Sequence, residues 1–359
     1  MIYKSIIKPL LFDLEAERAH DVTLNLGKYA SDSGLLKLLG KGLYSYRSPR
    51  LCQTFWGLHF KNPIGLAAGF DKNGEITEII EAIGFGFTEV GSITANPSAG
   101  NPRPRAFRLE RDQSLINRMG LNNDGAQTVI RRLEKKNPGI PIGINIAKTH
   151  DPEIVGDKAI RDYQFSFREA HKVADYITVN ISCPNTSEGK TFEDPAALDE
   201  LLDALNIKED ASAVPTLVKF SVDLERDHLE QLLDICSDHR VNGYVATNTS
   251  SRREGLHTDP KRLKKIGRGG LSGQAIVRKS TQVIRWIHEI TNGQKPIIGA
   301  GGINSFESAL EKIRAGADLL QIYTGFIYEG PGLIKRINKK LDHHLEKQGL
   351  DAIHQLIED

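Results

Sequence analysis

The chain has 359 residues, of which 39% are hydrophobic and 26% are charged, with a formal net charge of +1. Lysine and arginine are spread along the whole length, so the charge pattern argues against nucleic-acid binding. The 3 cysteines are far apart and form no C-x-x-C pair, which disfavours a disulfide framework, zinc or an iron–sulfur cluster and favours a reducing compartment.

Residues 1–45 predict two amphipathic helices. Ile2, Ile6 and Leu10 lie on one helical stripe, and a second stripe follows a break near residues 13–17. The segment has no signal-peptide pattern, and no apolar stretch in the chain approaches the roughly 20 residues of a spanning helix. We therefore expect a soluble protein or one that lies on a membrane without crossing it. The pattern alone equally allows a cap docked on the rest of the fold or a subunit contact.

Beyond about residue 60, buried strands, loops and amphipathic helices alternate. The strand candidates are rich in Ile, Val and Leu without strict alternation, as expected of parallel strands covered on both faces. They are Ile64 to Ala67, Phe87 to Gly91, Ile142 to Asn145, Ile177 to Ile181, Thr216 to Phe220, Gly243 to Thr247, Pro296 to Gly299 and Leu319 to Tyr323. Eight such units favour a closed (β/α)8 barrel, an α/β fold, with an open doubly wound sheet as the alternative.

Two helices between these strands have clear apolar stripes, over residues 76–83 and 306–313. Asn304 followed by Glu307 predicts a capping box at the start of the second. Two connections, 94–141 and 184 to about 214, are longer than ordinary barrel loops and are typical of lids or binding loops.

The active site of a barrel lies at the carboxyl ends of its strands, so its residues can be proposed in advance. Nearly all residues at these ends are polar or glycine. They are Ala68, Gly69, Lys72, Gly91, Ser92, Asn145, Asn180, Cys183, Lys219, Thr247, Asn248, Thr249, Gly301, Gly302, Tyr323 and Thr324.

The fourth strand candidate ends in a sequence suited to chemistry. Asn180 and Asn185 flank Cys183, which places two hydrogen-bonding amides beside a proton acceptor. This arrangement suits the binding and deprotonation of a small polar ring. The alternative is that Cys183 is an ordinary core residue. Ser182 is a rival base, although strand alternation turns it to the opposite face.

Three further features indicate an anionic or electron-rich ligand. Lys219 ends an apolar strand and needs a partner, either a flavin N1/O2 edge or a barrel carboxylate. Lys72 suits a substrate carboxylate or a pair with Asp71. The glycines of residues 299–302 precede a predicted helix and suit a phosphate, or else a tight barrel turn. No metal-binding motif occurs, and we predict no metal.

Together these motifs resemble dihydroorotate dehydrogenase, in particular the membrane-associated, quinone-reducing class 2. The resemblance covers nearly the whole chain. Its most specific segments are 65–74, 100–109, 116–125, 179–186, 246–249, 269–273 and 321–325.

The resemblance implies an FMN site and a dihydroorotate site. FMN would contact Ala68, Gly69, Phe70, Asp71, Lys72, Ser92, Asn145, Asn180, Lys219, Thr247, Gly273, Gly302, Tyr323 and Thr324. Dihydroorotate would contact Lys72, Asn117, Arg118, Met119, Gly120, Leu121, Asn180, Asn185, Asn248 and Thr249. Asparagine amides match the alternating C=O and N–H groups of a pyrimidine ring, while lysine matches the carboxylate.

The implied reaction belongs to pyrimidine biosynthesis. Cys183 would remove the C5 proton of dihydroorotate while C6 delivers hydride to the flavin, orotate would leave, and a membrane quinone would take the electrons. Residues 1–45 would form a hood through which the quinone enters, lined by His20 and Arg108, on a barrel of residues 46–359. We expect peripheral association with the cytoplasmic face of the inner membrane and no obligate protein partner.

Three positions differ from the class 2 pattern. Cys183 replaces the usual serine and is typical of class 1, Leu121 replaces a common aromatic residue, and residues 221–223 are Ser-Val-Asp rather than Ala-Pro-Asp. A class 1-like soluble enzyme using fumarate or NAD is therefore an alternative. Two further alternatives are a dihydrouridine synthase-type flavoprotein that binds tRNA and a non-catalytic barrel.

Overall fold

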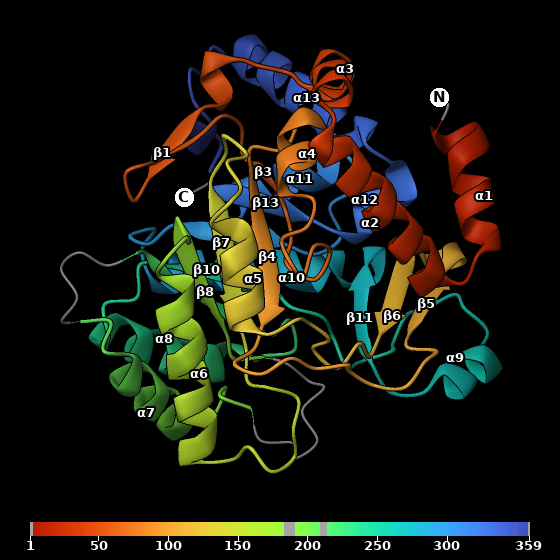
Figure 1. Cartoon of the computed structure of the whole chain (residues 1–359). Coiled ribbons are helices and arrows are strands. Elements are labelled where there is room, and N and C mark those ends of the chain that lie inside the picture. Colours follow the sequence, from red (N-terminus) through yellow and green to blue (C-terminus); the bar gives the residue numbers. More distant parts are fainter. Residues whose placement is uncertain (1–2, 183–190, 209–213, 358–359) are drawn as a thin grey trace.

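The computed structural model describes residues 3–182, 191–208 and 214–357 (Figure 1). Its centre is a closed barrel of parallel strands, in the order β3, β4, β7, β8, β9, β10, β12, β13. They span Ile64–Leu66, Phe87–Ile93, Ile142–Ile146, Tyr176–Asn180, Thr216–Phe220, Gly243–Ala246, Ile297–Ala300 and Leu319–Ile322. The predicted barrel is confirmed, and the open sheet is excluded because β13 pairs with β3 through Leu320 and Ile64.

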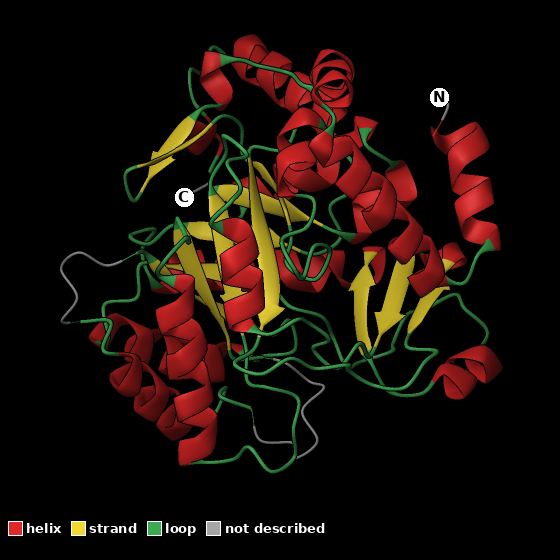
Figure 2. Ribbon diagram, in the orientation of Figure 1, coloured by secondary structure: helices red, strands yellow, loops and turns green. Residues whose placement is uncertain are grey.

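Helices cover the outside of the barrel, as Figure 2 shows. Every residue of these barrel strands is buried, which explains why the strand sequences do not alternate. The covering helices are α4 (Thr77–Ala82), α5 (Ala126–Leu133), α6 (Asp157–Ala170), α7 (Pro195–Leu205), α8 (Arg226–Asp238), α10 (Val277–Ile290), α11 (Phe306–Arg314) and α13 (Gly332–Gln348).

An aromatic cluster closes the amino-terminal end of the barrel. The hairpin of β1 (Gln53–Phe55) and β2 (Leu58–Phe60) covers it, and Phe60, Phe87 and Tyr176 pack beneath the hairpin. With this end filled, the opposite end of the barrel is left for a ligand.

The capping box predicted before α11 is wrong in its residues. Ser305, not Asn304, is the N-cap, since its backbone is extended (φ −152°) and its Oγ accepts from the N–H of Ser308 at 3.3 Å. Ser308, not Glu307, completes the box by accepting from the N–H of Ser305. The side chain of Asn304 instead donates to Gln113.

The long connection after β4 has secondary structure of its own. β5 (Ala106–Leu109) and β6 (Ser114–Asn117) join β11 (Gly270–Gly273) in an antiparallel sheet beside the barrel. α9 (Pro260–Ile266) leads into β11, and α12 (Thr324–Glu329) follows β13. Short 3-10 turns span Pro49–Leu51, Glu110–Asp112, Gln274–Ile276 and Ile353–Leu356. The other long connection contains α7, but residues 183–190 and 209–213 lie outside the described part of the chain.

The amino-terminal segment consists of a short π-helix (Tyr3–Ile7), α1 (Lys8–Asp13), α2 (Ala16–Asp32) and α3 (Gly34–Tyr44). The break near residues 13–17 and the second predicted helix, which is α2, are confirmed. α3 is a further helix that was not predicted, and it begins where the Ser33 hydroxyl accepts from the N–H of Leu36. α2 lies beside β5 of the small sheet (Figure 1). Within the described residues, no helix has the length and apolar character needed to cross a membrane. The boundary at residue 45 stays a prediction.

Candidate active site

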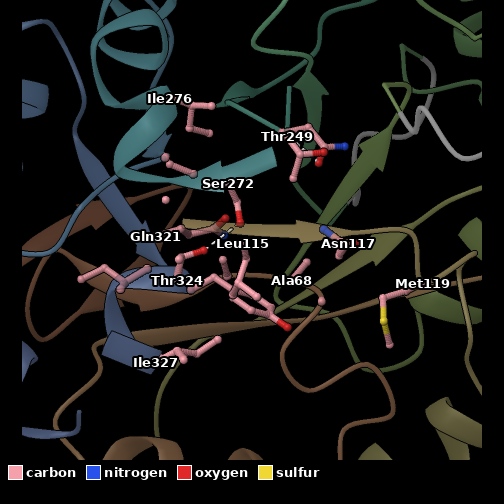
Figure 3. Close-up of a pocket in the computed structure, with 18 of the residues that line it drawn as sticks. Ala68, Leu115, Asn117, Met119, Thr249, Ser272, Ile276, Gln321, Thr324 and Ile327 are labelled. Carbon is pink, nitrogen blue, oxygen red and sulfur yellow. Dashed lines mark hydrogen bonds between the residues drawn. The ribbon is translucent and has the colours of Figure 1, made fainter. Parts of the chain in front are cut away.

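A cavity of about 220 Å³ opens at the carboxyl ends of the barrel strands, bounded also by the small sheet and by α2 (Figure 3). Strand ends that are far apart in the sequence meet here, because all barrel strands are parallel. The predicted site residues that line it are His20, Ala68, Gly69, Lys72, Ser92, Asn117, Met119, Gly120, Leu121, Asn180, Lys219, Thr247, Asn248, Thr249, Gly273, Gly301, Gly302, Tyr323 and Thr324.

Two predicted cofactor residues in the loop after β3 do not line the cavity. The buried carboxylate of Asp71 accepts from the backbone N–H groups of Glu75 and Ile76, both at 2.9 Å, and so holds the loop before α4. Phe70 packs between the rings of His20 and Tyr323, with centroid distances of 5.0 and 5.5 Å. Both side chains support the loop that carries Gly69 and Lys72 into the cavity.

Three other predicted residues also lie outside the lining. Asn145 is fully buried behind Ser92, which it contacts. Arg118 donates to the carbonyl of Ile266. Arg108 donates to the carbonyls of Leu11 and Leu14 between α1 and α2. Cys183 and Asn185 lie outside the described residues, so their predicted roles stay predictions.

The cavity contains a buried cation. Lys219, on β9, is 7% exposed, and burial lowers the pKa of its ammonium, an effect that Glu89 partly opposes. Glu89 acts on Lys219 through its charge, and no ion pair of Lys219 occurs among the described residues, so the predicted alternative of a direct salt bridge finds no support there. An electron-rich ligand edge would therefore find a cation available at this strand end.

A second lysine enters from the loop after β3. The ammonium of Lys72 donates to Asn122 Oδ1 at 2.7 Å and forms no ion pair with Asp71 in the described structure. Desolvation, with the charge of Arg105, lowers the pKa of Lys72 to about 8. Desolvation also lowers the pKa of the adjacent His20 to about 4, with a contribution from Lys72, so this histidine is neutral at physiological pH.

Glycines let the backbone approach closely on the far side of the cavity. Gly301 and Gly302 have φ angles of +116° and +75°, and a Cβ at Gly302 would lie 2.5 Å from Val277 Cβ. Gly273 also has a positive φ and would place a Cβ 2.5 Å from the carbonyl of Gln113. No other residue type fits these positions without strain, and the backbone N–H groups beside them suit a phosphate.

Among the described residues, two buried oxygen atoms at the cavity have no hydrogen-bond partner, Thr247 Oγ1 and Gln321 Oε1. Buried polar atoms are normally satisfied, so each is available to a polar ligand. Together with Lys219 and the glycines, these atoms fit a large planar cofactor that carries a phosphate.

Several cavity residues were not identified from the sequence as site residues. Gln321 and Ser272 belong to segments used for the resemblance but were not assigned a role, while Leu115 and Ile276 supply apolar surface (Figure 3). Glu89, buried inside β4, was also overlooked. A carboxylate in the middle of an apolar strand is itself an unusual signal that could have identified it.

The sequence profile of the dihydroorotate dehydrogenase family matches residues 50–345. The chain belongs to the dihydroorotate dehydrogenase family. It is 44% identical over 350 residues to the dihydroorotate dehydrogenase (quinone) of Gloeobacter violaceus, covering 98% of this chain and 97% of that one. It is 42% identical over 343 residues to the enzyme of the same name from Christiangramia forsetii, covering 95% and 98%. The family is flavin-dependent.

Solved structures agree with this assignment. The ligand-free dihydroorotate dehydrogenase of Eimeria tenella matches with a TM-score of 0.82 at 32% identity, covering 95% of this chain and 98% of that one. The complex of the Eimeria tenella enzyme with ferulenol matches with a TM-score of 0.81 at 31% identity, covering 95% and 94%. The matches extend into residues 1–45, because 95% of a 359-residue chain exceeds what residues 46–359 alone would provide.

Proposed function

We propose that this protein oxidises (S)-dihydroorotate to orotate in pyrimidine biosynthesis, with FMN as its flavin and a quinone as electron acceptor. The observation that carries this proposal is the cavity in which Lys219, the glycines and the amides Asn180 and Asn248 converge. The names of the full-length relatives support the acceptor class.

The cavity residues would hold FMN by complementary charge and shape. The N–H groups around Gly301 and Gly302 would bind the phosphate, and Lys219 would meet the ring edge that becomes negative on reduction. Thr247 Oγ1 and Gln321 Oε1 would gain the partners that they lack. When bound, the flavin supplies two-electron chemistry, accepting a hydride and later giving up its electrons.

The substrate would lie against the amides and Lys72. The ammonium of Lys72 would bind the carboxylate of dihydroorotate, while Asn180 and Asn248 would pair with ring C=O and N–H groups. Cys183 would act as the base that takes the C5 proton, a role assigned from its place in the sequence. Asn117 and Asn185 would complete the set of amides around the ring.

The quinone would approach between α1 and α2. His20 lines the cavity from α2, and Arg108 joins the two helices through the carbonyls of Leu11 and Leu14. α2 and α3 expose large apolar side chains in a manner suited to a lipid surface. They are Leu26, Tyr29, Leu35, Leu38, Leu39 and Leu43. We infer peripheral attachment to the membrane that holds the quinone, the cytoplasmic face of the inner membrane.

A spectroscopic experiment tests the proposal. The purified protein should be yellow, and its flavin should bleach when dihydroorotate is added in the absence of air. A soluble quinone in detergent should then restore the colour faster than fumarate or NAD. A colourless protein, or flavin that dihydroorotate does not bleach, would refute the activity. Faster reoxidation by fumarate or NAD would refute the acceptor.

A further inference from the structure

A buried carboxylate inside the barrel receives hydrogen bonds from several side chains. Glu89 is fully buried on β4 and does not line the cavity. Its oxygens accept from Asn145 Nδ2 at 2.8 Å, Gln321 Nε2 at 2.7 Å, Thr178 Oγ1 at 3.1 Å and Tyr176 Oη at 3.3 Å. The amide nitrogens of both Asn145 and Gln321 thus face this carboxylate, whose oxygens accept from them.

The orientation of Asn145 is passed on to the cavity. Because Asn145 Nδ2 faces Glu89, Asn145 Oδ1 faces Ser92 and accepts from the Ser92 hydroxyl. A serine hydroxyl has a single hydrogen, so Ser92 Oγ must act as an acceptor toward its other neighbour. That neighbour is Asn180, whose Nδ2 donates to Ser92 Oγ at 3.2 Å.

The same direction continues from Asn180 to Asn248, which follows β10. Asn180 Oδ1 accepts from Asn248 Nδ2 at 3.2 Å and from the Ser182 hydroxyl at 3.3 Å. Asn248 Oδ1 in turn accepts from the backbone N–H of Thr249 at 2.8 Å. The relay Glu89–Asn145–Ser92–Asn180–Asn248 thus begins at the Glu89 carboxylate and reaches the backbone N–H of Thr249, a group that can only donate.

Glu89 also orients a second amide at the cavity. Gln321 turns its nitrogen to the carboxylate, which leaves its Oε1 without a partner. Gln321 lines the cavity (Figure 3), so this oxygen is an acceptor held ready for a ligand donor. One buried carboxylate is therefore linked, directly or through Asn145 and Ser92, to the orientation of amides on β8 and β13.

We propose that Glu89 is the positioning residue that fixes the donor and acceptor pattern of this pocket. The proposal rests on the proposed function, because its ligand is a cyclic ureide whose C=O and N–H groups must meet amides in one orientation. A reversed amide would oppose donor to donor or acceptor to acceptor, leaving buried groups unpaired. Glu89 acts through Asn145 and Ser92 and need not touch the substrate.

The first test is Glu89→Gln, which can both donate and accept and so no longer orients Asn145. We expect orotate, titrated by calorimetry in the presence of excess FMN, to bind about tenfold more weakly than to the parent protein. The matched control is Thr178→Val, which removes another donor to the same carboxylate but leaves the relay intact. It should bind orotate within about twofold of the parent.

The exchange variant combines Glu89→Gln with Asn145→Asp, so that the carboxylate and the amide change places. It gives the decisive result even if Glu89→Gln alone does not fold. The carboxylate introduced at position 145 would accept from both the new amide at position 89 and the Ser92 hydroxyl, which restores the direction of the relay with the carboxylate moved. We expect this variant to bind orotate more tightly than Glu89→Gln. Unchanged binding in Glu89→Gln, or no recovery in the exchange variant, would overturn the role of Glu89. A parent protein that does not bind orotate would instead refute the proposed function.

Discussion

Glu17 on α2 and Arg105 before β5 form a buried ion pair between the amino-terminal helices and the small sheet. Arg105 Nη2 lies 2.7 Å from Glu17 Oε1, with side-chain exposures of 6% and 2%. The exposed Arg103 also lies 3.0 Å from the same oxygen. Burial would raise the pKa of Glu17, but hydrogen bonds and charge from the two arginines outweigh it and lower the pKa.

Removing Arg105 should destabilise the protein strongly, because it leaves the buried carboxylate of Glu17 without its buried cationic partner. We expect Arg105→Met to lower the free energy of unfolding by roughly 3 to 5 kcal/mol, measured by urea denaturation. Arg103→Met, which removes the exposed partner, should cost no more than about 1 kcal/mol. Equal losses in the two variants would contradict this ranking.

The same ion pair predicts a pH dependence of stability. The pKa of Glu17 is lower in the folded state, so its contribution is fully present above the unfolded pKa of about 4.3. It is lost as the pH falls through the lowered folded value. Urea denaturation at a series of acidic pH values should show this loss in the parent and a smaller one in Glu17→Gln. Parallel profiles would exclude Glu17 as its source.

Orotate binding should weaken at alkaline pH because of Lys72. With a pKa of about 8, its ammonium loses its proton above that value and no longer attracts a carboxylate. We expect the dissociation constant of orotate to be flat below pH 8 and to rise toward tenfold per pH unit above it. Lys72→Met should bind weakly at every pH, without this inflection. An inflection that persists in Lys72→Met would assign it to another group.

Lys219 should set the reduction potential of the flavin. A hydrogen bond from a charged donor contributes about 1.5 to 3 kcal/mol. Loss of this bond to the reduced ring edge in Lys219→Met should therefore lower the two-electron potential by roughly 30 to 60 mV. Lys148→Met is the control, because Lys148 is also buried at a strand end but donates to the carbonyls of Asp151 and Ile154. A potential shifted equally in both variants would rule out a specific role.

Gly302→Ala should abolish flavin retention. The new Cβ would meet Val277 at 2.5 Å at a φ of +75°, so the backbone that faces the phosphate must move. Gly255 has nearly the same φ, +73°, with open space around it. We expect Gly302→Ala to retain less than about a tenth of the parent flavin by absorbance and Gly255→Ala to retain it all. Comparable flavin content in the two variants would contradict the phosphate site.

Cys183→Ala should bind flavin but reduce it roughly 100- to 10,000-fold more slowly with dihydroorotate, the contribution of a positioned base. Stopped-flow absorbance measures this rate. Cys183→Ser should keep partial activity with its pH optimum shifted upward, since a hydroxyl loses its proton far less readily than a thiol. Flavin reduction at the parent rate in Cys183→Ala would remove the thiol from the mechanism.

The barrel could be predicted because its strands are apolar on both faces, and the run Thr216 to Phe220 matches β9 at both ends. The cavity lining followed from one rule, that parallel strands bring their carboxyl ends together. The supporting contacts could not be predicted. The resemblance implied that Asp71 contacts FMN, but its carboxylate accepts from nearby backbone N–H groups. Glu89 acquires its role only when β4 pairs with β7 and brings Asn145 beside it.

The hydroxyl of Tyr3 donates to the carbonyl of Ile327, which joins residues 324 positions apart. The barrel itself closes only when β13 pairs with β3. During synthesis, Tyr3 therefore leaves the ribosome long before its partner Ile327 exists. The barrel strands stay without a closed sheet until β13 has emerged, and a nascent chain stalled before residue 319 is the species most exposed to aggregation or to chaperone capture.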